Sequence, residues 1–181
     1  MKPWQLLTST PQKAGYKTIV IKDYLLPDGK EHEFTTLGEI GAQNVATIAI
    51  TPDRRVVVAR QFRPGPEKIF DELPGGGAAV GEDLATAAAR ELSEETGYAN
   101  DVLPQYLGSA CRDAYTNEVS NYFLAENCHQ SAAQRLDTTE FVEVALITIE
   151  QLVHNAKNGL MSDSVGVLLA YEKLKEIQEG L

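Results

Sequence analysis

Three glutamates and an arginine are gathered in one short stretch of this sequence: Arg90, Glu91, Glu94 and Glu95. If the stretch is helical, side chains three and four positions apart share one edge, so the carboxylates would crowd together. Their mutual repulsion, and their place near the carboxyl end of a helix, would be unfavourable without a compensating positive charge. Oxygen ligands gathered in this way suit Mg²⁺ or Mn²⁺. The cluster therefore indicates either a divalent metal site or a solvated acidic helix face.

The residues around the cluster predict the helix that would carry it. Glu82 and Asp83 place negative charge where a helix would begin, residues 84–95 are rich in alanine and leucine, and Gly97 is a typical left-handed terminator. Arg90 can pair with a glutamate four positions later, but one guanidinium does not neutralise three carboxylates. The segment is therefore predicted to be a loop, a helix and a stop.

The spacing of the whole segment resembles the Nudix box, the signature of hydrolases that cleave a nucleoside diphosphate linked to another moiety. Every specified position is filled, and the matching residues are Gly76, Glu82, Arg90, Glu91, Leu92, Glu94, Glu95, Gly97 and Tyr98. The resemblance implies an α/β fold, specifically an α/β/α sandwich on a mixed sheet. In that fold the box forms a loop, a helix and a second loop.

The same resemblance implies roles for individual residues. Arg90 would orient a carboxylate rather than touch the substrate, and Glu82 matches a position that is either a metal ligand, often through water, or structural. The site would hold two or more ions, Mg²⁺ or Mn²⁺, and box glutamates would also serve catalysis. The implied metal ligands are the carbonyl oxygen of Gly75 and the carboxylates of Glu91, Glu94 and Glu95.

The composition limits the other function classes. The chain has 181 residues, 43% hydrophobic and 23% charged, which is typical of one soluble globular domain. A net charge of −10 argues against a nucleic-acid partner, because phosphate neutralisation requires lysine and arginine. No apolar run resembles a secretory signal or a membrane span, so we expect a cytoplasmic protein without a membrane partner. Cys111 and Cys128 are interpreted as structural.

The amino-terminal residues predict a β-hairpin ahead of the box. Residues 16–26 show the alternation of a strand, and Pro27-Asp28-Gly29-Lys30 is typical of a turn. Residues 31–36 can then return as the partner strand. A lone hairpin is marginal in water and needs another surface. In the ADP-ribose pyrophosphatase branch of the Nudix family an N-terminal sheet of this kind mediates a homodimer. By that resemblance, residues 1–40 would be a dimerisation element and residues 41–181 the hydrolase domain.

A second predicted hairpin, residues 44–51 and 55–62, leads into the residues that resemble the ADP-ribose pyrophosphatase branch. The similar residues are Arg60-Gln61-Phe62-Arg63 and, after them, Glu72-Leu73-Pro74-Gly75-Gly76-Gly77. By this resemblance Arg63 contacts the diphosphate or the terminal ribose of the substrate. Glu72 belongs to the same substrate region as a support for the box loop. For Arg60, a phosphate contact and a solvated strand end are both open.

The stretch after the box bears on substrate choice. ADP-ribose pyrophosphatases usually carry a proline sixteen residues beyond the last box glycine, and that position here is Asp113. Thr116-Asn117-Glu118 nevertheless resembles the T-x-E that follows in that group. The departure leaves room for GDP-mannose, ADP-glucose or another nucleotide sugar besides ADP-ribose. Tyr115 lies between predicted strands 101–110 and 120–125, where it either stacks on a base or sugar or simply packs.

A last acidic segment precedes the predicted strand 141–147. There the family places a mobile loop whose glutamate is proposed as catalytic base or additional metal ligand. Glu140 matches it best, with Glu143 as the alternative, and an ordinary solvated loop carboxylate is also open. A helix is predicted from residue 148 to Asn158-Gly159. A final helix, capped by Ser162 or Asp163, is expected to bury Val165, Leu168, Leu169, Tyr171 and Leu174.

Together these patterns predict Mg²⁺-dependent hydrolysis of the diphosphate bond in ADP-ribose or a related nucleoside diphosphate sugar, giving a nucleoside monophosphate and a sugar phosphate. Two alternatives remain. One is a different Nudix chemistry, on dinucleotides, dinucleoside polyphosphates or RNA caps. The other is a Nudix-fold sensor that binds ADP-ribose-like molecules without cleaving them. The complete box weighs against a sensor and the acidic chain against long RNA, but small dinucleotides stay open.

Overall fold

The computed structural model describes residues 1–180, and its chain divides into two compact units. The first comprises Met1–Gln43 and Cys111–Ser120, and the second comprises Asn44–Ala110 and the chain from Asn121 onward. We describe each unit by itself. The division of function into residues 1–40 and 41–181 stays a prediction.

The first unit is built on a three-stranded antiparallel sheet of order β1-β2-β3. Its strands are β1 (Gln5–Ala14), β2 (Lys17–Leu25) and β3 (Glu31–Leu37). Gly15 and Gly29 turn the chain between them with φ of 64° and 82°, a region that glycine enters without steric cost. The predicted hairpin corresponds to β2 and β3. The first strand, β1, was not predicted, because all its residues are exposed and a strand without a buried face has no hydrophobic alternation.

The second unit holds a seven-stranded sheet whose main order is β12-β5-β4-β10-β9. Two short strands lie off this path, since β6 pairs with β5 and β7 pairs with β4. A separate two-stranded pair joins β8 (Tyr98–Ala99) to β11 (His129–Gln130). The seven strands are β4 (Gln43–Ile50), β5 (Val56–Arg63), β6 (Lys68–Glu72), β7 (Gly75–Gly77), β9 (Gln105–Cys111), β10 (Val119–Ala125) and β12 (Glu143–Ile147).

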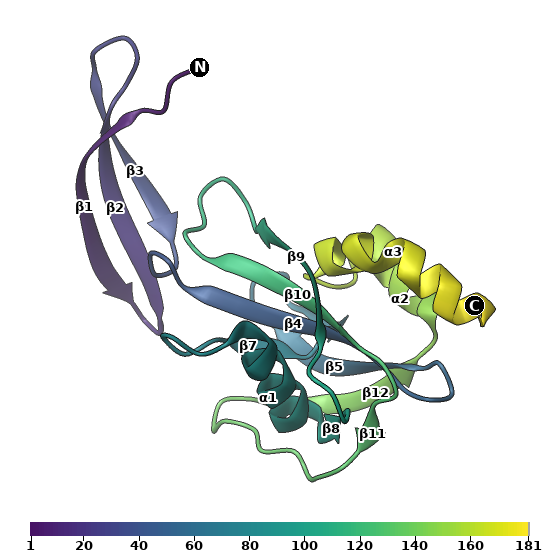
Figure 1. The fold of residues 1–181 in the computed structure, drawn as a ribbon. Coiled ribbons are helices and arrows are strands. Elements are labelled where there is room, and N and C mark those ends of the chain that lie inside the picture. Colours follow the sequence, from purple (N-terminus) through teal and green to yellow (C-terminus); the bar gives the residue numbers. More distant parts are fainter. Residues whose placement is uncertain (181) are drawn as a thin grey trace. The chain divides into compact units, whose positions relative to one another are not determined.

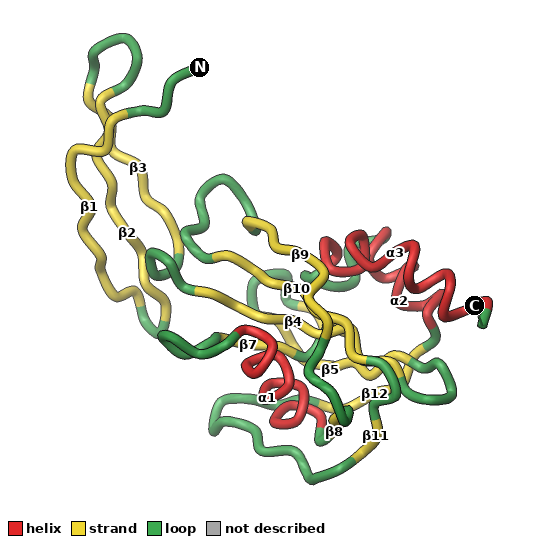
Figure 2. Tube along the Cα trace, in the orientation of Figure 1, coloured by secondary structure: helices red, strands yellow, loops and turns green. Residues whose placement is uncertain are grey.

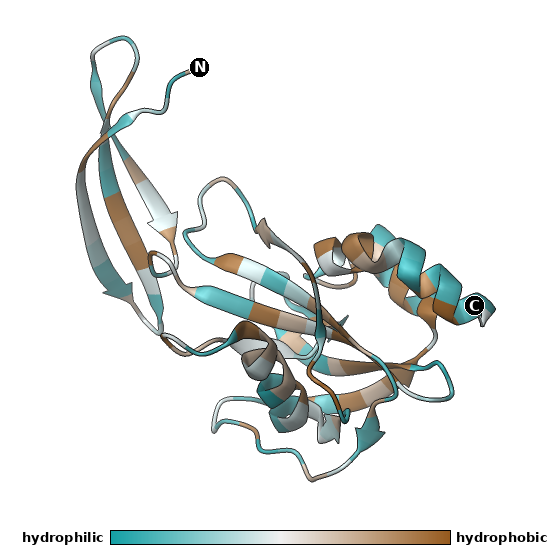
Figure 3. Cartoon of the chain, viewed as in Figure 1, coloured by the Kyte–Doolittle hydropathy of each residue, from teal (hydrophilic) through white to brown (hydrophobic). Residues whose placement is uncertain are grey.

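Helices cover both faces of this sheet. Helix α1 (Leu84–Thr96) lies on one face, and α2 (Ile149–Lys157) and α3 (Ser164–Glu179) lie on the other, as Figures 1 and 2 show. This arrangement confirms the predicted α/β/α sandwich. It also explains why consecutive residues of the central strands β4 and β5 are buried; Figure 3 shows brown, hydrophobic sections along the strands of this sheet.

Alternate residues of β4 supply the two halves of the core. Ile48 and Ile50 pack in the cluster that contains Leu152 and Leu174 from α2 and α3. Between them, Ala49 packs with Leu92 of α1. Successive side chains of a strand point to opposite faces, so β4 ties both helical layers to one sheet.

The predicted buried face of the last helix was largely wrong. Leu168 is 73% exposed, and Val165 and Leu169 are also exposed, whereas Leu174 is buried as expected. Small residues determine which face packs. A Cβ at Gly166 would lie 2.6 Å from a ring carbon of Tyr122, so the glycine lets α3 approach the sheet closely. The buried face of α3 is Gly166, Val167, Ala170, Leu174 and Ile177.

Two further observations concern the whole described chain. No helix within residues 1–180 is long and apolar enough to cross a membrane. Cys111 is exposed and Cys128 is buried, and both are free thiols.

The backbone contact between β7 and β4 generates a first prediction. A Cβ at Gly75 would lie 2.1 Å from the carbonyl oxygen of Val45, whereas a Cβ at Gly77 would meet nothing within 4 Å. We expect Gly75→Ala to lower the free energy of unfolding by about 1–3 kcal/mol, because the strands must separate.

Urea denaturation of the two variants beside the unmodified chain provides the measurement. Gly77→Ala is the matched control and should stay within about 0.5 kcal/mol of the parent. Equal stabilities for the Gly75 and Gly77 variants would show that β7 does not need its close approach to β4.

Candidate active site

The acidic cluster lies on α1, whose two ends are capped by the residues that the sequence indicated. The Asp83 side chain accepts a hydrogen bond of 2.9 Å from the backbone N–H of Thr86. At the other end Gly97 adopts φ of 74°, and its N–H donates to the carbonyl of Ser93 at 2.9 Å. These caps satisfy backbone groups that a helix leaves open at its ends, and they set the register of the glutamates.

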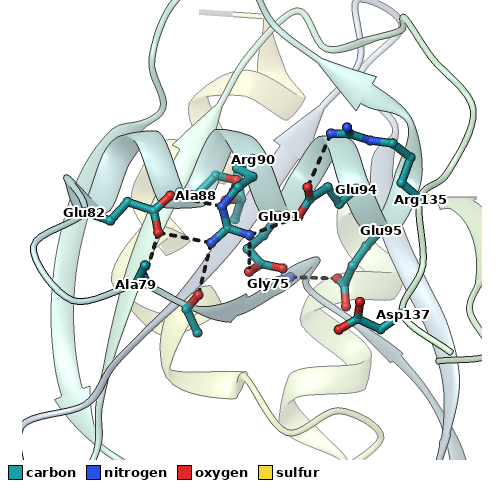
Figure 4. A network of polar contacts seen from close by, with 12 residues as sticks. Gly75, Ala79, Glu82, Ala88, Arg90, Glu91, Glu94, Glu95, Arg135 and Asp137 are labelled. Atoms are coloured by element: carbon teal, nitrogen blue, oxygen red, sulfur yellow. Dashed lines mark hydrogen bonds and ion pairs between the residues drawn. The ribbon is translucent and has the colours of Figure 1, made fainter. Parts of the chain in front are cut away.

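Arg90 lies at the centre of the acidic edge (Figure 4). Its Nε and Nη2 donate to the two carboxylate oxygens of Glu82 at 3.0 and 3.1 Å. Its Nη1 donates to Glu91 at 2.7 Å and to Glu94 at 3.0 Å, and Nη2 also reaches the carbonyl of Gly77 at 3.1 Å. A single guanidinium therefore joins three carboxylates to the loop ahead of the helix.

This pairing affects the carboxylates unequally. Hydrogen bonds from Arg90 and from the N–H of Ala79 lower the pKa of Glu82. Burial raises the pKa of Glu91 in spite of its bond to Arg90, and the negative charges of Glu94 and Glu140 add to the increase. Glu82 is thus paired within the protein at both carboxylate oxygens, whereas the bond to Arg90 does not offset the effect of burial on Glu91.

Glu95 is the least compensated carboxylate of the cluster. Its side chain is on a residue only 6% exposed, and one oxygen accepts the backbone N–H of Gly75 at 2.8 Å. Burial, together with the negative charges of Glu91 and Glu140, raises its pKa to about 8, although the hydrogen bond from Gly75 and the charge of Arg63 act in the opposite direction. Among residues 1–180 no lysine or arginine forms an ion pair with it.

Glycines bring the backbone next to these carboxylates. A Cβ at Gly76 would lie 2.6 Å from a carboxylate oxygen of Glu91. The first box glycine is therefore required by the close approach of the loop to the helix. Any larger residue would displace the carboxylate that faces it.

The donor set fits a hard divalent cation. Carboxylate oxygens of Glu91, Glu94 and Glu95, beside the backbone of Gly75, are ligands that Mg²⁺ and Mn²⁺ prefer. In the described part of the chain no three acidic, histidine or cysteine side chains converge as a ready metal cage. The hydrogen bonds explain this, since Arg90 holds Glu91 and Glu94 while Gly75 holds Glu95.

A second ion pair lies beside the box loop. Glu72 is completely buried, and its carboxylate accepts hydrogen bonds from Arg63 and from the side chain and backbone of Ser162. Both oxygens of Glu72 are therefore engaged by the protein. This placement favours a role for Glu72 in fixing the guanidinium of Arg63, which stays 42% exposed at its side chain.

The two candidate loop glutamates lie in different surroundings. Glu143 begins β12 and lies 3.5 Å from Arg60, whose guanidinium also holds Asp71 at 2.7 Å. Arg60 is thus occupied by two carboxylates. Glu140 belongs to the loop before β12, and its negative charge acts on Glu91 and Glu95. Of the two, Glu140 is the one whose charge reaches the box.

Glu140 also borders a pocket of about 490 Å³ on the β5, β6 and β12 side of the second unit. Three large apolar side chains around it are exposed, with Phe141 exposed over 84% of its surface. The pocket can therefore receive a flat or apolar group next to charged residues. Its lining comprises Arg60, Gln61, Phe62, Ile69, Leu136, Glu140, Phe141, Val142 and Glu143.

Tyr115 and Asp113 belong to the first unit. The Asp113 carboxylate accepts hydrogen bonds from the N–H of Tyr115 at 2.6 Å and from the hydroxyl of Thr116 at 2.9 Å. These bonds lower the pKa of Asp113. They form a side-chain turn at the position where the related branch usually has proline, so a different residue supplies local rigidity here. The Tyr115 side chain is exposed.

Several residues at the site had no signal in the sequence. Arg135 donates to Glu94 at 3.3 Å, Gln134 donates to the backbone carbonyl of Glu95 at 2.7 Å, and Ser162 binds Glu72. Each contact joins positions 39 to 90 residues apart, so no local spacing reveals it.

Comparisons with known proteins identify similar sequences and a similar fold. The NUDIX domain model matches residues 42–165. The chain is 31% identical over 160 residues to an ADP-ribose pyrophosphatase of Bacillus subtilis (strain 168), covering 87% of this chain and 85% of that protein. It is 31% identical over 158 residues to a methanol dehydrogenase activator of Bacillus methanolicus, covering 86% and 84%. A crystal structure of an ADP compounds hydrolase shares the fold, with a TM-score of 0.77 at 18% identity over 97% of this chain and 96% of that one.

The buried carboxyl of Glu95 generates a prediction about pH. The pKa of this carboxyl is about 8 in the folded protein and about 4.5 in an unfolded chain. The folded state therefore loses stability relative to the unfolded state as the pH rises between these two values. We expect the free energy of unfolding of metal-free protein to fall by on the order of 2–3 kcal/mol from pH 5 to pH 8 through this group.

Urea denaturation at several pH values measures the effect, with two variants beside the parent. Glu95→Gln should remove this decline, whereas Glu126→Gln, at an exposed position, should follow the parent. An identical pH dependence in the parent and in Glu95→Gln would contradict the assignment.

Proposed function

This chain belongs to the Nudix family, and we propose that it is a metal-dependent pyrophosphohydrolase acting on ADP-ribose or a related nucleoside diphosphate sugar. The observation that carries the proposal is the buried Glu95 carboxylate, which has no ion-pair partner among the described residues and lies within a complete box. Ionising such a group near neutral pH is costly unless a cation is bound beside it. Hydrolases of this family generally use a divalent cation, and such an ion would offset this cost.

The residues of the box divide the work. The carboxylates of Glu91, Glu94 and Glu95 and the carbonyl of Gly75 would hold Mg²⁺ or Mn²⁺, in two or more sites. Bound there, the ions would neutralise the diphosphate oxygens and lower the pKa of the attacking water. Arg90 keeps the carboxylates in register without contacting the substrate, because its Nε, Nη1 and Nη2 groups already donate hydrogen bonds to acceptors of the protein.

The remaining roles concern the proton and the leaving group. Glu140 accepts a proton from the attacking water while the oxygen of that water forms a bond to one phosphorus. The bond from that phosphorus to the bridging oxygen breaks, and the other phosphate leaves as a monoester. The products are a nucleoside monophosphate and a sugar phosphate. Glu143 is the weaker candidate for the base, because it is paired with Arg60.

Substrate recognition is assigned to Arg63 and its neighbours. The exposed side of the Arg63 guanidinium would bind the diphosphate or the terminal ribose, while Glu72 holds its other side. Arg60 and Tyr115 are secondary candidates, because Arg60 is engaged by Asp71 and Tyr115 belongs to the other unit. The Bacillus subtilis relative, named an ADP-ribose pyrophosphatase, supports ADP-ribose as the first substrate to test.

The first unit is proposed to form a homodimer through its sheet. Trp4, Leu6 and Leu7 are exposed at the start of this unit, and the Trp4 ring packs against Phe34 in a tilted arrangement with ring centroids 5.5 Å apart. An edge strand whose residues are all exposed is suited to pairing with a second copy. The enzyme would work in the cytoplasm, which agrees with two free thiols and which cell fractionation would check.

Incubation with Mg²⁺ and ADP-ribose, beside ADP-glucose and GDP-mannose, tests the function through chromatographic identification of products. We expect AMP and ribose 5-phosphate to appear fastest. Faster cleavage of a nucleotide hexose would move the preference to that sugar. No cleavage of any of the three would contradict the proposed activity and favour a sensor or a dinucleotide substrate.

Two carboxamide variants serve as controls in the same assay. Glu95→Gln should lower kcat at least a hundredfold with an unchanged circular dichroism spectrum, because it removes a metal-binding charge. Glu126→Gln replaces an exposed glutamate outside the box and should retain full turnover. Near-normal turnover of the Glu95 variant would refute its role as a ligand.

Sedimentation velocity tests the dimer. The chain has a mass of 19.8 kDa, and we expect a species of twice that mass at micromolar concentration. Leu6→Glu, which places a charge on the exposed strand, should shift the protein toward the monomer. A parent protein that sediments as a monomer would contradict this part of the proposal.

A further inference from the structure

The loop of residues 131–142 is held against the carboxyl end of α1. The N–H groups of Ser131 and Ala132 both donate to the carbonyl of Gly97, at 2.9 and 3.1 Å. The N–H of Arg135 donates to the carbonyl of Glu94 at 2.8 Å. The last carbonyls of a helix have no partner within the helix itself, and here the loop provides donors for them.

The Gln134 side chain adds a bond that backbone contacts do not provide. Its Nε2 donates to the carbonyl of Glu95 at 2.7 Å and to the carbonyl of Val142 at 3.2 Å. One amide group therefore joins the end of α1 to both the beginning and the end of the loop. Since a carboxamide nitrogen carries two hydrogens, this side chain uses its full donor capacity.

Glu140 lies between Gln134 and Val142, the two residues that the side-chain hydrogen bond of Gln134 joins. The N–H of Glu140 donates to the carbonyl of Asp137 at 3.0 Å, and the Glu140 carboxylate accepts the N–H of Asp137 at 2.9 Å. The turn from 137 to 140 is thus fixed internally. Its position relative to the box then depends on the contacts at the two ends of the loop.

We propose that Gln134 is a positioning residue, whose amide clamps the loop of residues 131–142 to α1 and so holds Glu140 at the box. The inference rests on the proposed hydrolase activity, and it adds a residue outside the box to the catalytic arrangement. The clamp contacts only backbone carbonyls, so it can act on the loop without contacting a substrate or a metal ligand's carboxylate.

The test compares Gln134→Met with Gln130→Met in steady-state hydrolysis of ADP-ribose. Methionine keeps the length of the side chain and removes its donors. Gln130 is the matched control, because it lies four residues earlier and its side chain makes no hydrogen bond within residues 1–180. We expect Gln134→Met to lower kcat about tenfold with KM within about twofold, and Gln130→Met to change neither.

The same substitution in a Glu140→Gln background identifies the route of the effect. If Gln134 acts through Glu140, adding Gln134→Met should lower kcat by less than about twofold there. A tenfold fall in both backgrounds would overturn the proposal, since it would show that Gln134 acts independently of Glu140. An unchanged kcat in the single variant would overturn it as well.

Hydrogen exchange separates failure of this inference from failure of the proposed function. Amides of residues 136–142 should exchange at least about fivefold faster in Gln134→Met than in Gln130→Met, with exchange in α1 unchanged. This readout needs no turnover, so it applies even to a protein that fails to hydrolyse any substrate. Equal exchange of the loop in both variants would refute the clamp itself.

Discussion

The structure around the box depends on how negative charge is distributed along one edge of α1. Arg90 is bonded to Glu82 in the loop ahead of α1 and to Glu91 and Glu94 on the helix, and without it these carboxylates would repel one another. The pairing stops short of Glu95, which is buried with a backbone N–H as its hydrogen-bond donor. Arg90 therefore offsets the repulsion among three of the carboxylates, while Glu95 at the carboxyl end of α1 has no cationic partner among the described residues. That deficit is the physical basis for expecting a divalent cation there.

The same strand pairing that stabilises the sheet also brings the backbone to the carboxylates. Strand β7 runs against β4 so closely that Gly75 has no room for a side chain, and its N–H then faces Glu95. The next residue, Gly76, faces Glu91 in the same way. Packing of α1 through Ala87, Ala88 and Leu92 fixes the other side of this contact. Fold stability and site geometry consequently share the same few residues, and a substitution at Gly75 affects both.

Much of this could be predicted from local spacing. Helix α1, its Asp83 and Gly97 caps and the β4 and β5 hairpin follow from patterns within a few residues of one another. Local patterns failed where packing decided the outcome. Strand β1 has no buried face to produce an alternation, and α3 turns its small residues, Gly166 among them, to the sheet although larger apolar residues are available. The contacts of Gln134, Arg135 and Ser162 join distant segments, so only the folded chain brings them together.

Direct measurement of metal binding tests the central claim that Glu95 and its neighbours form a cation site. Electron paramagnetic resonance detects free Mn²⁺ and can be followed as protein is added, in the absence of substrate. The account predicts that the unmodified chain binds Mn²⁺ and that Glu95→Gln weakens this binding at least about tenfold, the loss of one charged ligand. Equal Mn²⁺ affinity in the two proteins would contradict it, because the buried carboxylate would then have no part in holding the ion.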